Sequence, residues 1–267
     1  MNTINSHIQL PQFLMKGFCI PEEKGKCCYV WEIDTNEISK KSIKKIGAEV
    51  GYFLNETETY LNQQTESPMG QLVTNINKSI KIKGSYHFSD KDTKIIHCFC
   101  IHSIARGKMA LEIFEKNLVN SVYATLMHRN NPEFLRSFLV QSSVEYIANE
   151  NTYSAFRPSL MLNQTNLRFV NSSSGIFSMK NQGHEFLVIP ISRDIAITLS
   201  NGTLINWTVE LDEDVDKINF HAMRCELFYN HGGRFIISDN EENLLKMQHY
   251  FNQEHEAIKS IIEQYCQ

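Results

Sequence analysis

The longest run of apolar and small side chains predicts a buried helix in the first half of the chain. Ser89 and Asp92 open this run with the spacing of a capping box, and the run ends at Arg106. A helix that is apolar on all sides is normally buried in a sizeable core. After Gly107 the pattern becomes amphipathic, so we expect one central helix from Ser89 to Arg129 that carries Arg106 towards the middle of the protein.

Apolar side chains at helical spacing predict further helices on either side of this one. Pro11 favours a first helical turn, and the residues Leu10, Phe13, Leu14 and Phe18 form one apolar stripe. We expect four more helices, over residues 66–76, over 131–148 with Phe134, Phe138, Val144 and Ile147 inward, over 215–230, and from an N-cap at Ser238 to the end.

Alternating and β-branched stretches predict strands at both ends of the chain. Residues 27–33 and 38–43 flank a turn and read as a hairpin, and residues 186–192 and 195–199 read as a second hairpin. Further short strands are expected over 204–211 and 235–237, whereas the polar stretch 149–166 reads as a loop.

Together these elements predict a single α+β domain that spans residues 1–267. Its mostly helical body would surround the buried central helix of residues 89–129. An N-terminal β-hairpin and a C-terminal antiparallel sheet would pack on that body, because each amphipathic element must bury its apolar side against another.

Composition places the chain among ordinary globular proteins. Of the 267 residues 42% are hydrophobic and 21% charged, and the net charge of −4 argues against a broad nucleic-acid-binding surface. Seven cysteines form no regular framework, so we expect free thiols and the cytoplasm. The start of the chain lacks the basic and apolar regions of a signal peptide, and no apolar run is long enough for a membrane helix.

Candidate metal and phosphate motifs are weak in this sequence. His97, Cys98, Cys100 and His102 look like a ligand cluster, but on a helix Cys98 and His102 share a face while Cys100 points elsewhere. The sequence has no Gly-rich phosphate loop, nucleophile elbow, His-Glu-x-x-His motif or dinucleotide fingerprint. We therefore expect no metal and no cofactor.

The first seventy residues carry a resemblance to a known family. His7, Pro11, Gln12, Phe13 and Leu14 resemble the opening motif of a large, mostly bacterial family, domain-of-unknown-function family four-two-three-eight. The resemblance continues through a strand hairpin and then through Gly47, Glu49, Tyr52 and Phe53, through Glu58, Leu61 and Glu66, through Arg106, through residues 169–173 and through residues 186–192. Ser173 stands where many members have Asp, and the family brings no established activity.

A dispersed polar set supplies the candidate site residues. His7 is a candidate general base, Glu66 an acid or orienting group, and Arg106 a clamp for an anion. Gln12, Arg106 and Ser172 are candidate ligand-binding residues. The structural alternative is an ion pair, because a buried arginine needs a carboxylate partner and Glu66 is the expected one.

Two functions of different classes follow from these residues. One is an intracellular hydrolase or nuclease-like effector that uses His7, Glu66 and Arg106, with a nucleotide or nucleic acid as its partner and phage defence as its setting. The setting follows only from the distribution of the resembling family. The other is a non-catalytic binding or regulatory module that recognises a small anion or a protein partner. We expect no interaction with a membrane for either function.

Overall fold

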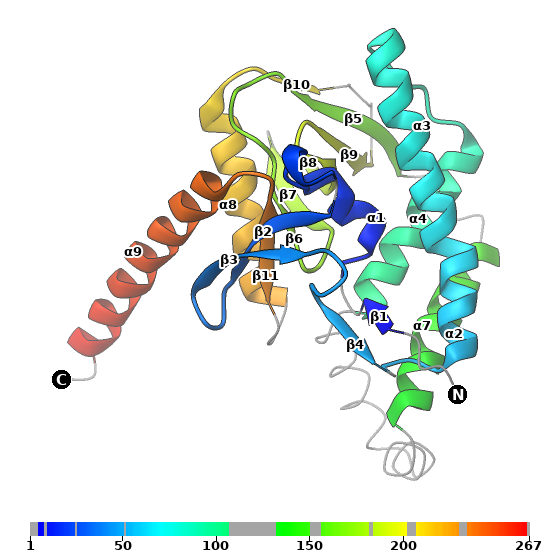
Figure 1. Cartoon of the computed structure of the whole chain (residues 1–267), viewed down its shortest axis with the longest axis horizontal. Helices are drawn as coiled ribbons and strands as arrows, with labels where there is room; N and C mark the ends of the chain where they lie inside the picture. Colours follow the sequence, from blue (N-terminus) through cyan, green and yellow to red (C-terminus); the bar gives the residue numbers. More distant parts are fainter. Residues whose placement is uncertain are drawn as a thin grey trace.

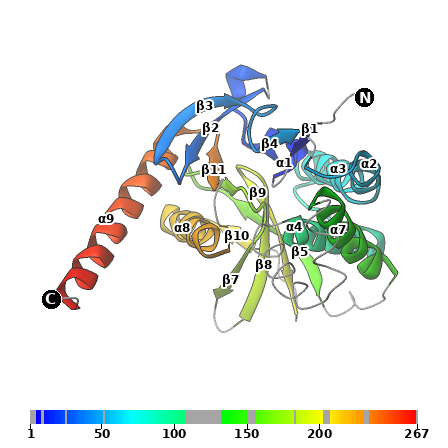
Figure 2. The same cartoon turned by 90° about the horizontal axis from the view of Figure 1, so that it is seen from below.

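The computed structural model describes residues 5–7, 10–24, 26–50, 52–106, 132–149, 156–181, 184–201, 207–229 and 234–265. Two larger β-sheets lie between two groups of helices (Figure 1). Helices α2, α3, α4 and α7 gather on one flank, whereas α8 and α9 lie on the other, as a view from below also shows (Figure 2). Their bounds are α2 (Asn55–Leu61), α3 (Ser67–Lys83), α4 (Asp90–Arg106), α7 (Pro132–Asn149), α8 (Asp212–Tyr229) and α9 (Glu241–Tyr265).

The larger sheet has five strands in the order β10-β5-β9-β8-β7. Neighbours pair antiparallel except β10 and β5, which run parallel. A register shift between Pro190 and Ser192 interrupts the pairing of β8 with β9. The strands are β5 (Arg157–Asn163), β7 (Phe177–Asn181), β8 (His184–Ser192), β9 (Ile195–Ser200) and β10 (Trp207–Val209).

The second sheet joins strands from distant parts of the sequence in the order β3-β2-β11-β6. Val30 on β2 pairs with Ile237 on β11, about two hundred positions later. The strands are β2 (Cys27–Glu32), β3 (Glu37–Ser42), β6 (Asn171–Ser172) and β11 (Phe235–Ser238). A separate two-stranded sheet pairs β1 (Asn5–His7) with β4 (Ala48–Val50).

The period-two pattern of these strands divides the core between two faces of the second sheet. Val30 and Ile237 join the largest apolar cluster, which also includes Leu160 and Ile197 of the five-stranded sheet. Their neighbours Trp31 and Ile236 point the other way, into a cluster with α8 and α9. The largest cluster also takes Leu14, Met69, Ile76, Ile96 and Phe99 from the helices.

A short helical segment near the start of the chain lies against the five-stranded sheet. It comprises α1 (Gln12–Met15) and the 3₁₀ turn η1 (Lys16–Phe18), followed by a further 3₁₀ turn, η2 (Pro21–Glu23). A Cβ atom added at Gly17 would lie 2.2 Å from the carbonyl oxygen of Ile191 on β8. The Arg193 N–H donates to the Gly17 carbonyl at 3.1 Å, so glycine allows a direct backbone contact here.

The predicted arrangement of the fold is wrong. The N-terminal hairpin is no separate unit, because β2 pairs with β11 inside a four-stranded sheet. The sheet from the second half of the chain is mixed rather than antiparallel, because β10 runs parallel to β5. The largest apolar cluster joins the two sheets, while α4 lies among the helices of one flank. The expected continuation of the central helix over 107–129 lies outside the described residues.

Several local predictions also need correction. The expected loop over 149–166 contains the buried strand β5, in which Pro158 and flanking polar residues mask a short apolar run. Phe138 is exposed rather than inward, and Phe134 and Ile147 lie outside the residues whose side chains are described. Asn240, not Ser238, caps α9, because its Oδ1 accepts the Glu242 N–H at 2.8 Å.

Other local predictions are confirmed. Ser89 Oγ accepts the Asp92 N–H at 3.2 Å, and Asp92 Oδ2 accepts the Ser89 N–H at 2.9 Å, which completes the capping box of α4. The hairpin of β8 and β9 and helices α7, α8 and α9 lie where the pattern predicts them. Within the described part of the chain, no helix has the length and apolar character needed to cross a bilayer.

Candidate functional site

Arg106, the last residue of α4, lies buried against two carboxylates. Its side chain is 1% exposed, and its Nη1 donates to Glu66 Oε1 at 2.6 Å. Its Nη2 lies 3.6 Å from Glu58 Oε1, beyond hydrogen-bonding distance, and its Cζ lies 5.2 Å from the centre of the Phe53 ring. The predicted ion pair between Arg106 and Glu66 is therefore confirmed.

A buried histidine extends this ion pair into a directed chain of hydrogen bonds. Arg106 can only donate, so His102 Nε2, 3.1 Å from its Nη1, must accept. His102 Nδ1 then carries the proton and donates to Thr65 Oγ1 at 2.7 Å, and Thr65 donates to the Leu61 carbonyl at 2.7 Å. Burial and the nearby Arg106 hold the pKa of His102 well below its ordinary value, which agrees with a neutral ring.

The helical segment that carries Glu66 has an irregular turn. A π-helical turn, η3 (Asn62–Glu66), joins α2 to α3 without a break. Thr65 faces the buried His102, whereas Asn62, Gln63 and Glu66 face a pocket on the other side. Turns of this kind occur often at functional sites, because the wider spacing re-aims side chains.

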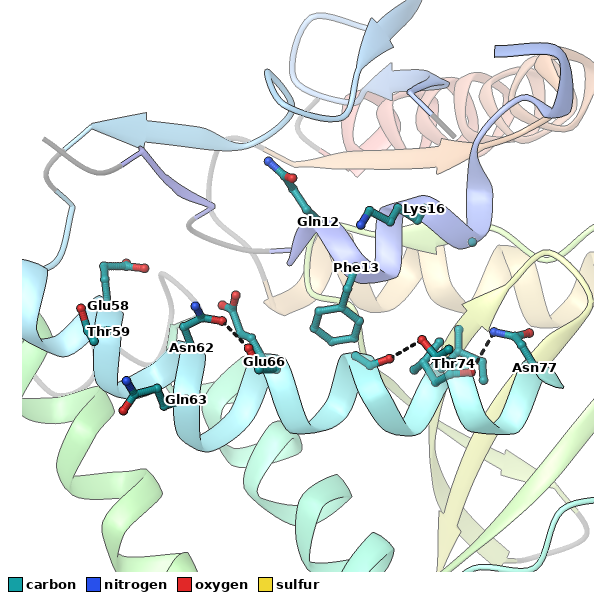
Figure 3. Close-up of a pocket in the computed structure, with 15 residues that line it drawn as sticks. Gln12, Phe13, Lys16, Glu58, Thr59, Asn62, Gln63, Glu66, Thr74 and Asn77 are labelled. Carbon is teal, nitrogen blue, oxygen red and sulfur yellow. Dashed lines mark hydrogen bonds between the residues drawn. The ribbon is translucent and has the colours of Figure 1, made fainter. Parts of the chain in front are cut away.

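The pocket lies between the α1–η1 segment and the continuous run of α2, η3 and α3 (Figure 3). Its volume is about 740 Å³, within the ~300–1,000 Å³ that is usual for small-molecule sites. Most of its lining is polar: Gln12, Lys16, Glu58, Thr59, Asn62, Gln63, Glu66, Ser67, Thr74 and Asn77, with Phe13, Gly17, Gly70, Val73 and Ile191 between them.

Charges of opposite sign come from opposite walls of this pocket. Glu58 and Glu66, with side chains 13% and 24% exposed, stand on the α2–η3 wall, and the exposed Lys16 stands on η1 (Figure 3). Arg106 is not a lining residue and contacts the two glutamates from the protein side. The arrangement can therefore accept hydrogen bonds at one wall and attract an anionic group at the other.

Of the other candidate site residues, Gln12 lines the pocket from α1, and Ser172 does not line it. Ser172 is buried in β6, where its backbone N–H donates to Asn171 Oδ1 at 2.8 Å. His7 pairs with Ala48 in the small sheet, and its side chain lies outside the described part. The proposed catalytic roles of His7, Glu66 and Arg106 stay predictions.

Sequence reasoning missed most of the lining. Lys16, Asn62, Gln63, Thr74 and Asn77 look like ordinary solvated helix positions, because polar side chains normally cover the outer face of an amphipathic helix. Glu58 belongs to the family resemblance, but nothing in the sequence placed it beside Arg106. Only the helical spacing of Glu58, Asn62 and Glu66, four positions apart, signalled one shared face.

A fully buried carboxylate contacts Ser173, the residue that stands where many members of the resembling family have Asp. Glu226 on α8 is fully buried and accepts hydrogen bonds from the Ser173 hydroxyl and from the Ser174 hydroxyl, the latter at 2.7 Å. The Ser174 N–H also donates to Glu226, at 3.2 Å. Ser173 thus acts as a hydrogen-bond donor to an acid, which ties the turn after β6 to α8.

The cysteines are free thiols in the described part of the chain. Burial raises the pKa of Cys19 to about 11 and that of Cys28 to about 12, so both thiols are poor nucleophiles. Burial also raises the pKa of Cys98 and of Cys100. Among the described residues, no three His, Cys, Asp or Glu side chains converge as metal ligands would.

Comparisons of this chain with protein-family models, with curated proteins and with solved structures find no match. The resemblance drawn from the opening motif therefore stays a prediction, and the function must be argued from the pocket itself.

Proposed function

We propose that this chain is a binding module that takes a small polar molecule into the pocket between α1 and α3. The observation that carries this proposal is the lining: amide, hydroxyl and carboxylate side chains of three successive helical segments face one space of about 740 Å³. Small-molecule sites use a few convergent polar groups to fix the orientation of the ligand.

A small anion held by Arg106 fits this geometry less well than the other ligand classes. The guanidinium is 1% exposed, and its Nη1 already donates to Glu66 and His102. Two carboxylates against one lysine also disfavour a nucleic-acid backbone, whose binding depends on several cations. The structural alternative for Arg106 and Glu66 therefore has the stronger support.

The second candidate is a hydrolase that acts on a molecule in the same pocket. It is favoured by the presence of Glu58 and Glu66 on one wall, because paired carboxylates serve as acid and base in several hydrolases. In this version Glu58 or Glu66 is the catalytic acid or base, and Arg106 and His102 position Glu66. The free thiols of the described part favour the cytoplasm as the compartment for either function.

The binding proposal is tested by calorimetry on the full chain with four probes: glucose, trialanine, spermidine and inorganic phosphate. A variant that blocks the pocket, Thr74→Trp, is compared with Lys78→Trp, an exposed position on the same helix that does not line the pocket. We expect at least one of the first three probes to bind and Thr74→Trp to weaken its binding at least tenfold, with Lys78→Trp unchanged.

Failure of glucose, trialanine and spermidine to bind, or binding that Thr74→Trp leaves intact, would contradict the binding proposal. The hydrolase version predicts in addition that the bound compound is converted to products and that Glu58→Gln abolishes this turnover. Binding without products would leave the module non-catalytic.

A further inference from the structure

The two charged walls of the pocket differ in how firmly their groups are held. Glu66 is fixed from behind by Arg106, which is itself held by the chain of bonds to His102 and Thr65. Lys16 is exposed on the facing wall and can swing on its flexible stem. One end of the site is thus preorganised and the other adapts to the length of the ligand.

The lining between these ends matches the groups of a peptide backbone. Gln12, Asn62, Gln63 and Asn77 each carry an amide (Figure 3). Asn62 Oδ1 accepts from the Ser67 hydroxyl at 2.9 Å and Asn77 Nδ2 donates to the Val73 carbonyl at 2.9 Å, so Asn62 offers its Nδ2 and Asn77 its Oδ1 to a ligand. A backbone amide offers the complementary donor and acceptor. Phe13 and Val73 add apolar surface between them, against which a small side chain can pack.

We infer that the ligand is a zwitterion with separated charges, specifically a short peptide with free termini, an inference that rests on the proposed binding function. Its ammonium group donates to Glu66 and Glu58, and its carboxylate pairs with Lys16. A single amino acid would leave most of the pocket to water, whereas a peptide of a few residues fills it and reaches both walls.

The inference is tested by calorimetry with trialanine in four forms: free, N-acetylated, C-amidated and blocked at both ends. We expect the free peptide to bind most tightly, with acetylation and amidation each weakening the binding about tenfold or more, since each block removes one ion pair. In Lys16→Met the free and the amidated peptide should bind equally. The control Lys44→Met, at an exposed turn position, should keep the wild-type order.

Each alternative result points to a different failure. Equal binding of the free and the fully blocked peptide would overturn the recognition of termini. Loss of the amidation effect in Lys44→Met as well as in Lys16→Met would overturn the assignment to Lys16. If glucose or spermidine binds and no peptide does, the proposed binding function is supported and the inference of a zwitterionic ligand is wrong. Binding of none of the probes would remove both.

Discussion

A guanidinium that has lost its water needs acceptors, and Nη1 of Arg106 has two, whereas its buried Nε and Nη2 have no hydrogen-bond partner among the described residues. Glu66 accepts a charged hydrogen bond at 2.6 Å and His102 accepts one at 3.1 Å, while Glu58 adds charge from 3.6 Å. Because the arginine cannot lose its proton, it dictates which nitrogen of His102 carries a hydrogen. One residue thus sets the charge and the tautomer of its neighbourhood.

We expect Arg106→Met to lower the free energy of unfolding by about 3 kcal/mol or more, since it leaves two glutamates without their cation. Adding Glu66→Gln should restore part of this loss, with a coupling energy above about 1 kcal/mol in the double-mutant cycle. Urea unfolding of the wild type, the two single variants and the double variant measures this coupling energy. The control Arg157→Met removes an exposed arginine 3.7 Å from Asp90 and should have little effect. A coupling energy near zero would contradict the structural role of the pair.

His102 predicts a dependence of stability on pH. The folded pKa lies well below the ordinary value of 6.5, so below pH 6.5 the unfolded chain binds a proton that the folded chain refuses. The stability that the neutral ring contributes is therefore complete above pH 6.5 and is lost as the pH falls below it, by up to about 1.4 kcal/mol per unit.

Urea midpoints of the wild type and of His102→Asn between pH 5 and 8 measure this contribution. We expect the variant to be less stable at neutral pH but to lose less stability on acidification. The control His87→Asn, at an exposed position, should keep the wild-type slope. A slope in His102→Asn equal to that of the wild type would show that this histidine does not titrate differently on unfolding.

At the scale of elements, the pocket depends on the contacts that hold its two walls in place. The α2–η3–α3 wall is held by the bond between Thr65 and His102, and the α1–η1 wall by the contact of Gly17 with Ile191. We expect Gly17→Ala to destabilise the protein by about 1–3 kcal/mol, because the new methyl group would overlap backbone rather than a flexible side chain.

The matched change is Gly70→Ala on the other wall, where the added Cβ would lie 3.4 Å from Phe13 in ordinary contact. This change should be neutral or stabilising, because alanine favours a helix interior over glycine by up to ~1 kcal/mol. Thermal unfolding of both variants is the measurement. Equal effects of the two substitutions would contradict the close contact of η1 with β8.

Local patterns predicted elements well and their pairing badly. The capping box of Ser89 and Asp92 and the hairpin of β8 and β9 depend on neighbours in sequence, so the local sequence predicts them. The sequence around Val30 or Ile237 does not indicate that these residues pair. This pairing makes the observed fold differ from the predicted one. At the site, the desolvation of Arg106 pointed to Glu66, whereas nothing in the sequence brought Lys16 opposite to it.

At the scale of the whole molecule, one core connects both sheets, and the chain offers a probe in each. It has two tryptophans: Trp31 lies in β2 against Phe251, and Trp207 lies in β10 against Phe186. We expect the single-tryptophan variants Trp31→Phe and Trp207→Phe to show urea midpoints by fluorescence that coincide with those by circular dichroism of the same protein, since the largest apolar cluster takes residues from both sheets. Separate midpoints would indicate two domains.

The pairing of β2 with β11 also has a consequence for how the protein is made. During synthesis the hairpin of β2 and β3 leaves the ribosome first, and the strand that covers the open edge of β2 follows about two hundred residues later. The α1–η1 wall of the pocket likewise cannot pack in place until β8 has been synthesised. The nascent chain therefore carries an unpaired strand edge while about two hundred further residues are synthesised, and such an edge can pair with other chains.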